Sequence, residues 1–401
     1  MRILLAHNYY QSGSPSGEDA VFANERLLLE QAGHEVIAFE RSNDAIGSGL
    51  TSRLTAAVAA SWSQSSHREL TRLIAKHRPQ VAHFHNTFPL LSPSTYAACR
   101  QADVPVVQTL HNYRLICPGA LLMRDGKPCE QCIGQSPWPA VRHACYRNSR
   151  TATTVVATML SVHRLRKTYI DDVDCYIALT DFARQRFIRG GLPATKIVVR
   201  PNCLMDMPAV GHGAGGYALY VGRLSSEKGV RTLVEAWRGL DCPLKIVGDG
   251  ILRAELEARA SQSTSRIEFL GFRKRDEVLA LMRDAAFVII PSECYEGFPV
   301  TVLEALATGT PLIVSALGAL DEIVIAPRHG LKFQAGDRDS LRSSVTALLA
   351  QPELQQAMRR DNRALFESHY CADRGLESLI GIYERARRAA ETSLRPALAG
   401  A

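Results

Sequence analysis

Residues 285–311 read Ala-Ala-Phe-Val-Ile-Ile-Pro-Ser-Glu-Cys-Tyr-Glu-Gly-Phe-Pro-Val-Thr-Val-Leu-Glu-Ala-Leu-Ala-Thr-Gly-Thr-Pro. The six apolar residues that begin the stretch predict a buried parallel strand, and the proline at 291 ends it. Pro299 opens a short helix, because a missing N–H costs nothing at a helix start, and Gly309 and Pro311 end it. The stretch therefore predicts a strand, a loop and a helix in succession.

Two glutamates eight residues apart, Glu296 and Glu304, lie on this strand–loop–helix unit. Glu296 falls on the loop just before the helix, and Glu304 falls inside the helix. The N–H groups of a first helical turn have no partner within the helix, so this end suits an anion. Gly297 lets a ligand approach the backbone closely. The pattern favours a ligand site where this strand ends.

The same alternation of strand and helix patterns continues along the chain in two series. Strands of the first series are expected at 3–6, 35–39, 81–85, 104–110, 175–179 and 198–199. Strands of the second are expected at 217–221, 244–247, 267–270, 285–290 and 312–314. The glycine-rich segment 208–216 lies between them and is interpreted as a linker, since it precedes a strand instead of following one. This alternation predicts α/β domains with doubly wound parallel sheets.

A chain of 401 residues is too long for one ordinary core, so two domains are expected. We place an N-terminal domain at 1–207 and a C-terminal domain at 208–375. The amphipathic end of the chain, 376–401, is expected to pack back on the N-terminal domain. No apolar stretch is long enough to span a membrane, and the N-terminus reads as a strand and not as a signal peptide. We therefore expect a cytoplasmic protein.

The net charge of +7 is unevenly distributed. Residues 1–200 carry 23 Lys and Arg against 15 Asp and Glu, which gives +8, whereas residues 201–401 carry 24 against 25, which gives −1. Within 51–170 the counts are 15 and 4, or +11. This basic region is either a solvated surface or a face for phospholipid headgroups or lipid diphosphates. Nucleic acid is disfavoured, because the basic residues are dispersed and lack interleaved aromatics.

Four of the ten cysteines cluster in the sequence, namely Cys117, Cys129, Cys132 and Cys145. The two-residue spacing between Cys129 and Cys132 is that of zinc sites, so a structural zinc would staple this loop. Surface thiols or an occasional disulfide are equal alternatives. The other cysteines are scattered and are expected in cores or loops.

Several motifs at the expected strand ends resemble one known family, the retaining glycosyltransferases of the GT-B fold, family 4, of the kind that builds bacterial surface polysaccharides. The most specific match is the Glu-x7-Glu motif of Glu296 and Glu304. Further matches are 221–229 (Val-Gly-Arg-Leu-Ser-Ser-Glu-Lys-Gly), 246–250 (Ile-Val-Gly-Asp-Gly), 82–86 (Ala-His-Phe-His-Asn) and 109–112 (Thr-Leu-His-Asn). The resemblance covers nearly the whole chain and implies two Rossmann-like domains that face a central cleft.

The resemblance implies a nucleotide-sugar site in the C-terminal domain, for a UDP- or GDP-sugar. Arg223 and Lys228 would hold the departing diphosphate, where negative charge develops. Glu296 would contact hydroxyls of the transferred sugar, and Glu304 would accept hydrogen bonds from the ribose. The backbone amides of Gly297 and Phe298 would touch the phosphates. Gly271 and Phe272 would contact the base, although Phe272 could equally be core packing.

In the N-terminal domain the resemblance places His111 against the donor sugar, near the reacting carbon. Gly17 would let the loop after the first strand approach the distal phosphate. His83 and His85 lie on one face of a strand, and we expect them to line or support the cleft, since no third metal ligand has a clear spacing. No cofactor is expected, and Asp172 and Asp174 precede a strand, so they are treated as surface groups.

The function that follows is sugar transfer to a glycan or lipid-linked acceptor, in the synthesis of lipopolysaccharide, exopolysaccharide or capsule. Residues 113–170 would specify the acceptor, expected to be a polyprenyl-diphosphate-linked glycan. An apolar helix at 151–162, flanked by basic residues, could rest on the inner face of the membrane or simply be packed. The alternatives are a nucleotide-sugar epimerase or sugar phosphorylase of the same fold, or a catalytically silent partner that binds a sugar nucleotide or glycan.

Overall fold

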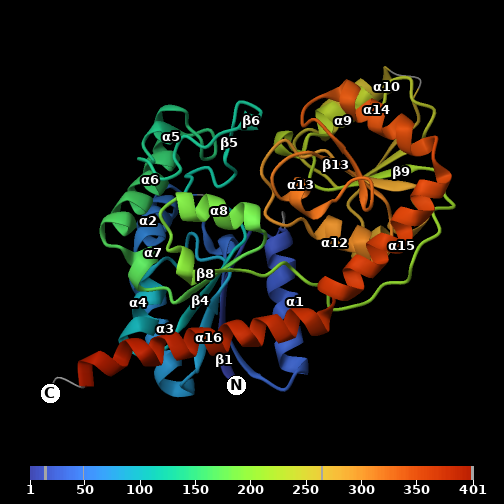
Figure 1. The fold of residues 1–401 in the computed structure, drawn as a ribbon. Helices are drawn as coiled ribbons and strands as arrows, with labels where there is room; N and C mark the ends of the chain where they lie inside the picture. The colour runs from blue at the N-terminus through green and yellow to red at the C-terminus, as the bar shows by residue number, and fades with distance from the viewer. Residues whose placement is uncertain (13–15, 48, 263–264, 399–401) are drawn as a thin grey trace. The chain divides into compact units, whose positions relative to one another are not determined.

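Two six-stranded parallel sheets organise the chain in a computed structural model (Figure 1). The structure describes residues 1–12, 16–47, 49–262 and 265–398. The chain forms two compact units. The first unit comprises Met1–Leu121, Glu130–Pro201 and Gly375–Ala401, and the second comprises Leu122–Cys129 and Asn202–Arg374.

The sheet of the first unit has the strand order β2-β1-β3-β4-β7-β8 and is parallel throughout. Its strands are β1 (Arg2–Tyr9), β2 (Glu35–Ser42), β3 (Val81–Phe84), β4 (Val106–Leu110), β7 (Cys175–Ala178) and β8 (Ile197–Val199). The order reverses beside β1, between β1 and β3. At such a switch point the loops diverge and leave room for a ligand.

The sheet of the second unit has the order β11-β10-β9-β12-β13-β14, which is that of a Rossmann domain. Its strands are β9 (Ala218–Val221), β10 (Leu244–Val247), β11 (Ile267–Gly271), β12 (Phe287–Ile290), β13 (Leu312–Ser315) and β14 (Gly330–Phe333). The switch point here lies between β9 and β12. A short antiparallel hairpin pairs β5 (Met123–Arg124) with β6 (Lys127–Pro128).

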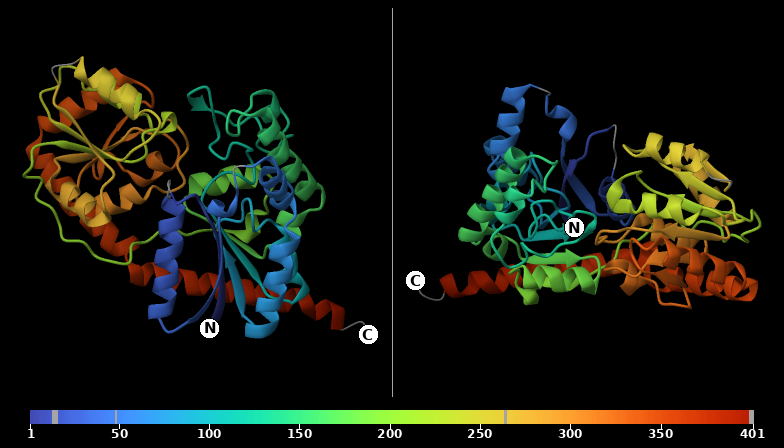
Figure 2. Two further views of the ribbon diagram at one scale, coloured as in Figure 1. Left: turned by 180° about the vertical axis from the view of Figure 1, so that it is seen from behind. Right: turned by 90° about the horizontal axis from the view of Figure 1, so that it is seen from above.

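Helices cover both faces of each sheet (Figure 2). Those of the first unit's sequence are α1 (Gly17–Gln31), α2 (Leu50–Ser61), α3 (Gln64–His77), α4 (Ser94–Gln101), α5 (Pro139–Arg142), α6 (Arg150–Leu165), α7 (Thr168–Asp171) and α8 (Asp181–Arg189). Those that follow are α9 (Val230–Ala236), α10 (Arg253–Ser261), α11 (Arg275–Asp284), α12 (Val300–Ala307), α13 (Ala319–Ile323), α14 (Arg338–Leu349), α15 (Pro352–His369) and α16 (Ala372–Leu398). Single 3-10 turns are η1 (Asn43–Ala45), η2 (Ala194–Lys196) and η3 (Ser226–Lys228).

Each sheet has its own apolar core. In the first unit, Ile3, Val81 and Val107 pack with Leu379 and Tyr383 of α16, so the last helix is part of this core. In the second unit, a larger cluster surrounds Trp237, which is fully buried. The two cores account for the two series of apolar strands in the sequence.

The predicted fold class, an α/β fold with two Rossmann-like sheets, is confirmed. The first helix begins with a capping box, in which Ser16 and Asp19 bond each other's backbone, as their spacing indicates. Strand β14 and helix α15 were not predicted. Strand β14 is short and begins with Gly330, and glycine is disfavoured in strands, so residue propensities do not predict it. Glycine is required there because a Cβ would lie 2.1 Å from the carbonyl oxygen of Leu312.

Candidate active site

The switch point of the second sheet brings together the loops that follow β9 and β12. Gly229 ends the first loop with φ +66°, and a Cβ there would lie 1.7 Å from the carbonyl oxygen of Pro291. Only glycine allows the two backbones to come this close. The contact places Lys228 beside Glu296 of the second loop, with Nζ 2.7 Å from Oε1. Gly229 therefore closes this turn against the neighbouring loop instead of keeping it open.

The Lys228–Glu296 pair is ionised and mostly shielded from solvent, with the two side chains 26% and 12% exposed. Ser292 also donates to Glu296 Oε1, from 2.5 Å. Burial raises the pKa of Glu296, but Lys228 and Ser292 outweigh it and hold the pKa below its usual range. For Lys228, burial lowers the pKa, but the opposing interactions, chiefly those with Glu296, outweigh it and leave the pKa above its usual value. Lys228 is thus held as a cation, and Glu296 as its carboxylate partner, at the carboxyl end of the sheet.

Arg223 lies two residues after the end of β9 and is more exposed, at 54% of its side chain. Its Nη2 contacts Glu227 Oε1 at 3.2 Å, and Ser225 donates to the same oxygen at 2.6 Å. An exposed ion pair of this kind contributes at most about 1 kcal/mol. The guanidinium can therefore leave Glu227 for a stronger anion at little cost.

Helix α12 carries Glu304 and begins at Val300, with Pro299 as its N-cap. No side-chain hydrogen bond caps this end, so its amides are available to an anion. Glu304 is buried, and Arg275 Nε lies 3.2 Å from its Oε1. Burial raises the pKa of Glu304, and Arg275 only partly offsets this.

Arg275 and Asp206 complete this part of the site. Neither residue was predicted from the sequence to belong to it. Arg275 binds both oxygens of Asp206 at 2.8 Å while also contacting Glu304. Asp206 lies far from Arg275 in sequence and belongs to a segment without regular structure. No spacing rule links them, so this contact was beyond sequence analysis.

The remaining residues predicted to bind the donor have separate positions in the second unit. Gly297 lies on the loop between β12 and α12. Phe298 is buried, packs edge-on against Tyr370 with 5.5 Å between centroids, and accepts from Asn202 Nδ2 at 3.2 Å. Gly271 ends β11 with φ +68°. Phe272 is 71% exposed, so the core-packing alternative is wrong.

Two residues of the first unit, His111 and Gly17, were also predicted to contact the donor. His111 follows β4 and is half-buried. Gly17 is the first residue of α1 and is exposed, but residues 13–15 of the loop before it lie outside the described residues. Asn112 donates to Glu18 Oε1 at 2.8 Å, which ties the end of β4 to the start of α1.

His111 is joined to a buried polar network. Its Nε2 lies 2.9 Å from His85 Nδ1, and His85 Nε2 lies 3.1 Å from Glu25 Oε1. Arg200 Nη1 donates to the other oxygen of Glu25 at 2.8 Å. His83 Nδ1 lies 3.0 Å from Glu25 Oε1 and 2.8 Å from the Tyr383 hydroxyl. Its Nε2 lies 2.8 Å from the Thr109 hydroxyl. Of these two histidines, His85 contacts His111 and lines a pocket, whereas His83 is fully buried behind it.

Glu25 was not predicted as a site residue, although its position on an apolar helix face indicates a special role. The buried face of α1 comprises Val21, Phe22, Glu25, Leu28 and Leu29, at helical spacing. A carboxylate within an apolar stripe is rarely left unpaired. This position could therefore have been identified as the centre of a buried ion pair.

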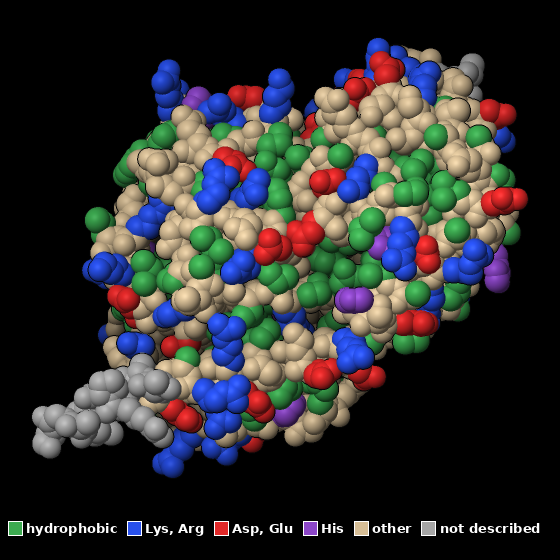
Figure 3. Space-filling model, viewed as in Figure 1, with side chains coloured by type: hydrophobic (Ala, Val, Ile, Leu, Met, Phe, Trp, Pro, Cys, Tyr) green, Lys and Arg blue, Asp and Glu red, His purple; other side chains and the backbone are tan. Residues whose placement is uncertain are grey.

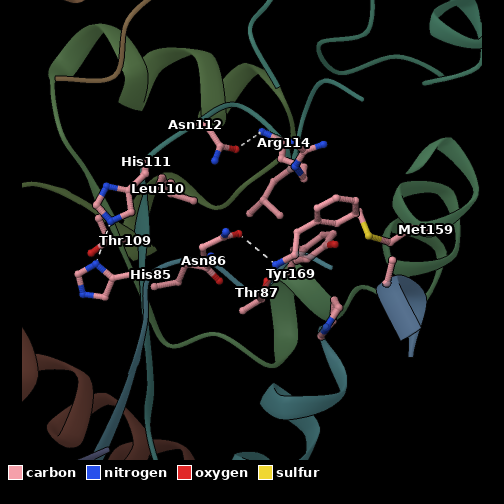
Figure 4. Close-up of a pocket in the computed structure, with 15 residues that line it drawn as sticks. His85, Asn86, Thr87, Thr109, Leu110, His111, Asn112, Arg114, Met159 and Tyr169 are labelled. Carbon is pink, nitrogen blue, oxygen red and sulfur yellow. Dashed lines mark hydrogen bonds between the residues drawn. The ribbon is translucent and has the colours of Figure 1, made fainter. Parts of the chain in front are cut away.

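A pocket in the first unit opens beside this network (Figure 4). His85, His111, Asn112 and Arg114 are among the side chains that line it, together with the apolar Met159. The guanidinium of Arg114 lies over the rings of Phe88 and Tyr146, at 4.3 and 5.0 Å from their centroids. The pocket thus combines hydrogen-bonding groups at the strand ends with one cation and an apolar wall.

The cysteine cluster gives no support to a zinc site. Among the described residues, the ligand atoms that gather within 4.8 Å of one another are those of Glu25, His83 and His85, and no three of Cys117, Cys129, Cys132 and Cys145 do so. None of the ten cysteines, all of which lie within the described residues, forms a disulfide. The Asp172–Asp174 turn is structural, since Asp174 accepts from the backbone of Val106 at 2.8 Å.

Comparisons with known proteins agree with this arrangement. Residues 212–365 match the family model "Glycosyl transferases group 1", and residues 17–203 match "Glycosyl transferase 4-like domain". Glycogen synthase of Mycobacterium tuberculosis is 33% identical over 318 residues, which are 78% of this chain and 70% of that protein. An uncharacterized glycosyltransferase of Methanocaldococcus jannaschii is 30% identical over 173 residues, 43% of this chain and about half (49%) of that one.

A solved structure, Anabaena HepE in complex with UDP, shares the fold. Its TM-score is 0.63 at 17% identity, and the alignment covers 98% of this chain and 100% of that chain. The likeness at this identity concerns the fold alone.

Proposed function

Since the chain belongs to the group 1 glycosyltransferases of GT4 type, we propose that it is a retaining enzyme that uses a UDP- or GDP-sugar as donor. The acceptor would be a glycan or lipid-linked glycan in the synthesis of a surface polysaccharide. Glycosyltransferases of this type typically act without a metal ion, so the chemistry rests on side chains and backbone. The Lys228–Glu296 pair at the switch point of the second sheet is the observation that carries the proposal.

Breaking the bond between a sugar and a diphosphate leaves negative charge on the diphosphate. Lys228 supplies a fixed cation for that charge, Arg223 a mobile one, and the uncapped start of α12 a set of amides. Preorganised charges of this kind are usually the largest catalytic contribution. Gly17 and the backbone of Gly297 and Phe298 are proposed as further phosphate contacts.

Glu296 is proposed to read hydroxyls of the transferred sugar. Its Oε1 already accepts from Lys228 and Ser292, which suits a positioning carboxylate better than a nucleophile. We therefore favour transfer on one face of the sugar, in which the acceptor hydroxyl bonds to the anomeric carbon as the diphosphate leaves. The departing phosphate oxygen takes the proton of that hydroxyl. His111 is proposed to contact the donor sugar near the reacting carbon.

Glu304 is proposed as the anchor of the ribose. A ribose hydroxyl would compete with Arg275 for a carboxylate whose burial already raises its pKa. Gly271 and the exposed Phe272 are proposed as the contact for the base. UDP in the Anabaena neighbour makes a uridine donor the first to test.

Nucleotide-sugar binding can be tested by thermal shift with a panel of UDP- and GDP-sugars. One donor should raise the melting temperature, and Lys228→Ala and Glu296→Ala should abolish that shift. Lys332→Ala is the matched control, because Lys332 belongs to the same unit, is 25% exposed and pairs with Asp321 at 2.8 Å. Shifts in the two site variants equal to that of the control would contradict the proposed site.

Membrane contact is a separate part of the proposal, for a polyprenyl-diphosphate-linked acceptor. No helix among the described residues is long and apolar enough to cross a bilayer. The apolar residues of α6 are largely packed, since Val156, Met159 and Leu160 are buried, so the stretch 151–162 is not itself a membrane face. The end of α6 is different: Leu165 is 85% exposed.

The end of α2 lies beside the end of α6. His163 Nε2 bonds to the carbonyl of Ser61 at 2.8 Å, and the half-exposed Trp62 directly follows Ser61 in the chain. Arg166 and Lys167 follow and are exposed. An aromatic, an aliphatic and two basic side chains suit the interface of an anionic membrane. Elsewhere, Lys and Arg are dispersed among acidic and apolar side chains on the face shown in Figure 3.

Flotation with anionic liposomes tests this surface. The wild type should float at low salt, and Leu165→Glu should reduce the bound fraction. Ile251→Glu is the control, because Ile251 is also exposed, at 91%, but lies in the second unit. Equal binding of both variants, or no flotation of the wild type, would contradict membrane contact at this surface.

A further inference from the structure

His111 stands at the end of a line of three side chains drawn from distant parts of the first unit. Glu25 comes from the buried face of α1, His85 follows β3, and His111 follows β4. The rings of His85 and His111 face each other, with centroids 5.0 Å apart and planes inclined by 23° (Figure 4). Each neighbouring pair is joined by one hydrogen bond. The group that donates in one bond therefore determines which ring nitrogen donates in the next.

First, Glu25 can only accept hydrogen bonds, because its carboxylate is ionised. Arg200 donates to its Oε2 at 2.8 Å, and both side chains are 4% exposed. Burial raises the pKa of Glu25, yet Arg200 and then the histidines outweigh it and hold the pKa well below its usual range. An ionised carboxylate has no proton to give. The bond of 3.1 Å between Glu25 Oε1 and His85 therefore carries the proton on His85 Nε2.

The second step concerns the other ring nitrogen of His85. Burial, with the adjacent His83, lowers the pKa of His85 to about 4, so the ring is neutral at neutral pH. A neutral imidazole with its proton on Nε2 has a lone pair on Nδ1. His111 Nε2, 2.9 Å away, must then donate to it. The pKa of His111 is also lowered by burial, so this ring is neutral and its own Nδ1 carries no proton.

We propose that Glu25 and His85 are positioning residues that hold His111 in the Nε2–H tautomer, so that its Nδ1 accepts a hydrogen bond from a ligand hydroxyl. His111 lines the pocket with Asn112 and Arg114, where such a hydroxyl would bind. The role in turnover rests on the proposed function, with a sugar hydroxyl as the partner. The tautomer itself does not depend on that function, because it follows from the hydrogen bonds together with the ionised Glu25 and the two neutral rings.

A metal ion is the other chemistry that these residues could support. The ligand atoms of Glu25, His83 and His85 lie within 4.8 Å of one another. However, Arg200 occupies one oxygen of Glu25, and both ring nitrogens of His83 have hydroxyl partners, Tyr383 and Thr109. A cation in this group would lie beside a buried guanidinium and displace satisfied hydrogen bonds. The hydrogen-bonded line accounts for the contacts without either cost.

Long-range ¹H–¹⁵N correlation on the full chain, with ring-labelled histidine, reads each tautomer directly. The signals of His111 are assigned by their loss in His111→Gln. At neutral pH, His111 and His85 should both be Nε2–H tautomers in the wild type. His85→Phe removes the acceptor, and His111 should then become a mixture of tautomers. Glu25→Gln, if folded, should disturb both histidines.

His83→Gln is the matched control, because His83 is as buried as His85 and equally close to Glu25 but does not contact His111. The control should leave the His111 tautomer unchanged. An Nδ1–H tautomer of His111 in the wild type, or no change in His85→Phe, would overturn the proposal. Stoichiometric metal in the purified wild type, removed by a chelator with loss of these signals, would overturn it as well.

Turnover separates this inference from the proposed function. With an active donor and acceptor, His85→Phe should lower kcat by about 2- to 10-fold, because only part of His111 then has an Nδ1 acceptor for the hydroxyl. His83→Gln should keep most of kcat. An unchanged kcat in His85→Phe would refute the role in turnover. If no donor supports transfer by the wild type, the proposed function fails, and the spectra still decide the tautomer.

Discussion

The two units solve the same problem, a charged group away from water, in different ways. In the second unit, Lys228 and Glu296 lie on two loops at the sheet edge and keep part of their surface in solvent. In the first, Glu25 and Arg200 are 4% exposed and are held by a network from several segments. An accessible charge can meet a ligand, whereas a buried one can only orient its neighbours. The contrast is consistent with the roles that we propose, ligand binding for the loop pair and positioning for the network.

The largest effect is expected from breaking the buried pair. Glu25→Gln leaves Arg200 charged and without its carboxylate, which should cost about 3–5 kcal/mol in the free energy of unfolding. Glu30→Gln is the control on the same helix, since Glu30 pairs with Arg26 at 40% and 41% exposure and should cost less than about 1 kcal/mol. Urea unfolding measures both. Similar losses for the two variants would remove the distinction between buried and exposed pairs.

The loop pair should matter more for turnover than for folding. Lys228→Met should lower kcat by about 100- to 1000-fold, because a fixed cation at the leaving diphosphate is lost. Steady-state kinetics with the donor from the thermal-shift screen measures this, and Lys332→Met serves as the control. If Lys228→Met changed only KM, the lysine would bind ground state and transition state equally, and the proposed catalytic role would be wrong.

The network should make the first unit sensitive to mild acid. The pKa of His85 falls from 6.5 to about 4 on folding, so between these values the unfolded chain binds the extra proton. Stability is therefore complete above about pH 6.5 and should fall by about 3 kcal/mol as the pH drops to 4. The side chains that face His85 are those of Glu25, His83, His7 and His111.

Urea midpoints measured across this pH range check the expectation. His85→Gln should flatten the profile, because glutamine does not titrate. The depressed pKa of Glu25 acts in the same direction but at lower pH, since its stabilisation is lost only as the pH falls through its folded value. A profile that is flat in the wild type between pH 6.5 and 4 would contradict the buried neutral His85.

The smallest effect is expected at Phe272, at the edge of the second unit. Phe272→Ala should change the free energy of unfolding by less than about 0.5 kcal/mol, because the ring is 71% exposed. Phe298→Ala, where the ring is buried against Tyr370, should cost about 3–5 kcal/mol. Chemical denaturation compares the two. A large loss at Phe272 would show that the ring is packed in solution.

The alternation of strands and helices can be predicted from local sequence, because buried parallel strands need continuous apolar runs and helices need capping and ending residues. It also placed Glu296 on a loop and Glu304 in a helix, since Pro299 and Gly309 bound that helix locally. The family followed from these ordered motifs. All of these features depend on residues close together in the chain.

Which side chains contact one another depends on the folded arrangement of segments that are far apart in the chain. Lys228 and Glu296 are 68 residues apart, and Glu25 and Arg200 are 175 apart. Their contacts depend on the strand order β9-β12 in one sheet and β1-β3-β4 in the other, together with the packing of α1. Local patterns fix what each segment becomes, but the order of parallel strands fixes which carboxyl ends are neighbours. That is why the loop pair and the histidine line emerged only from the fold.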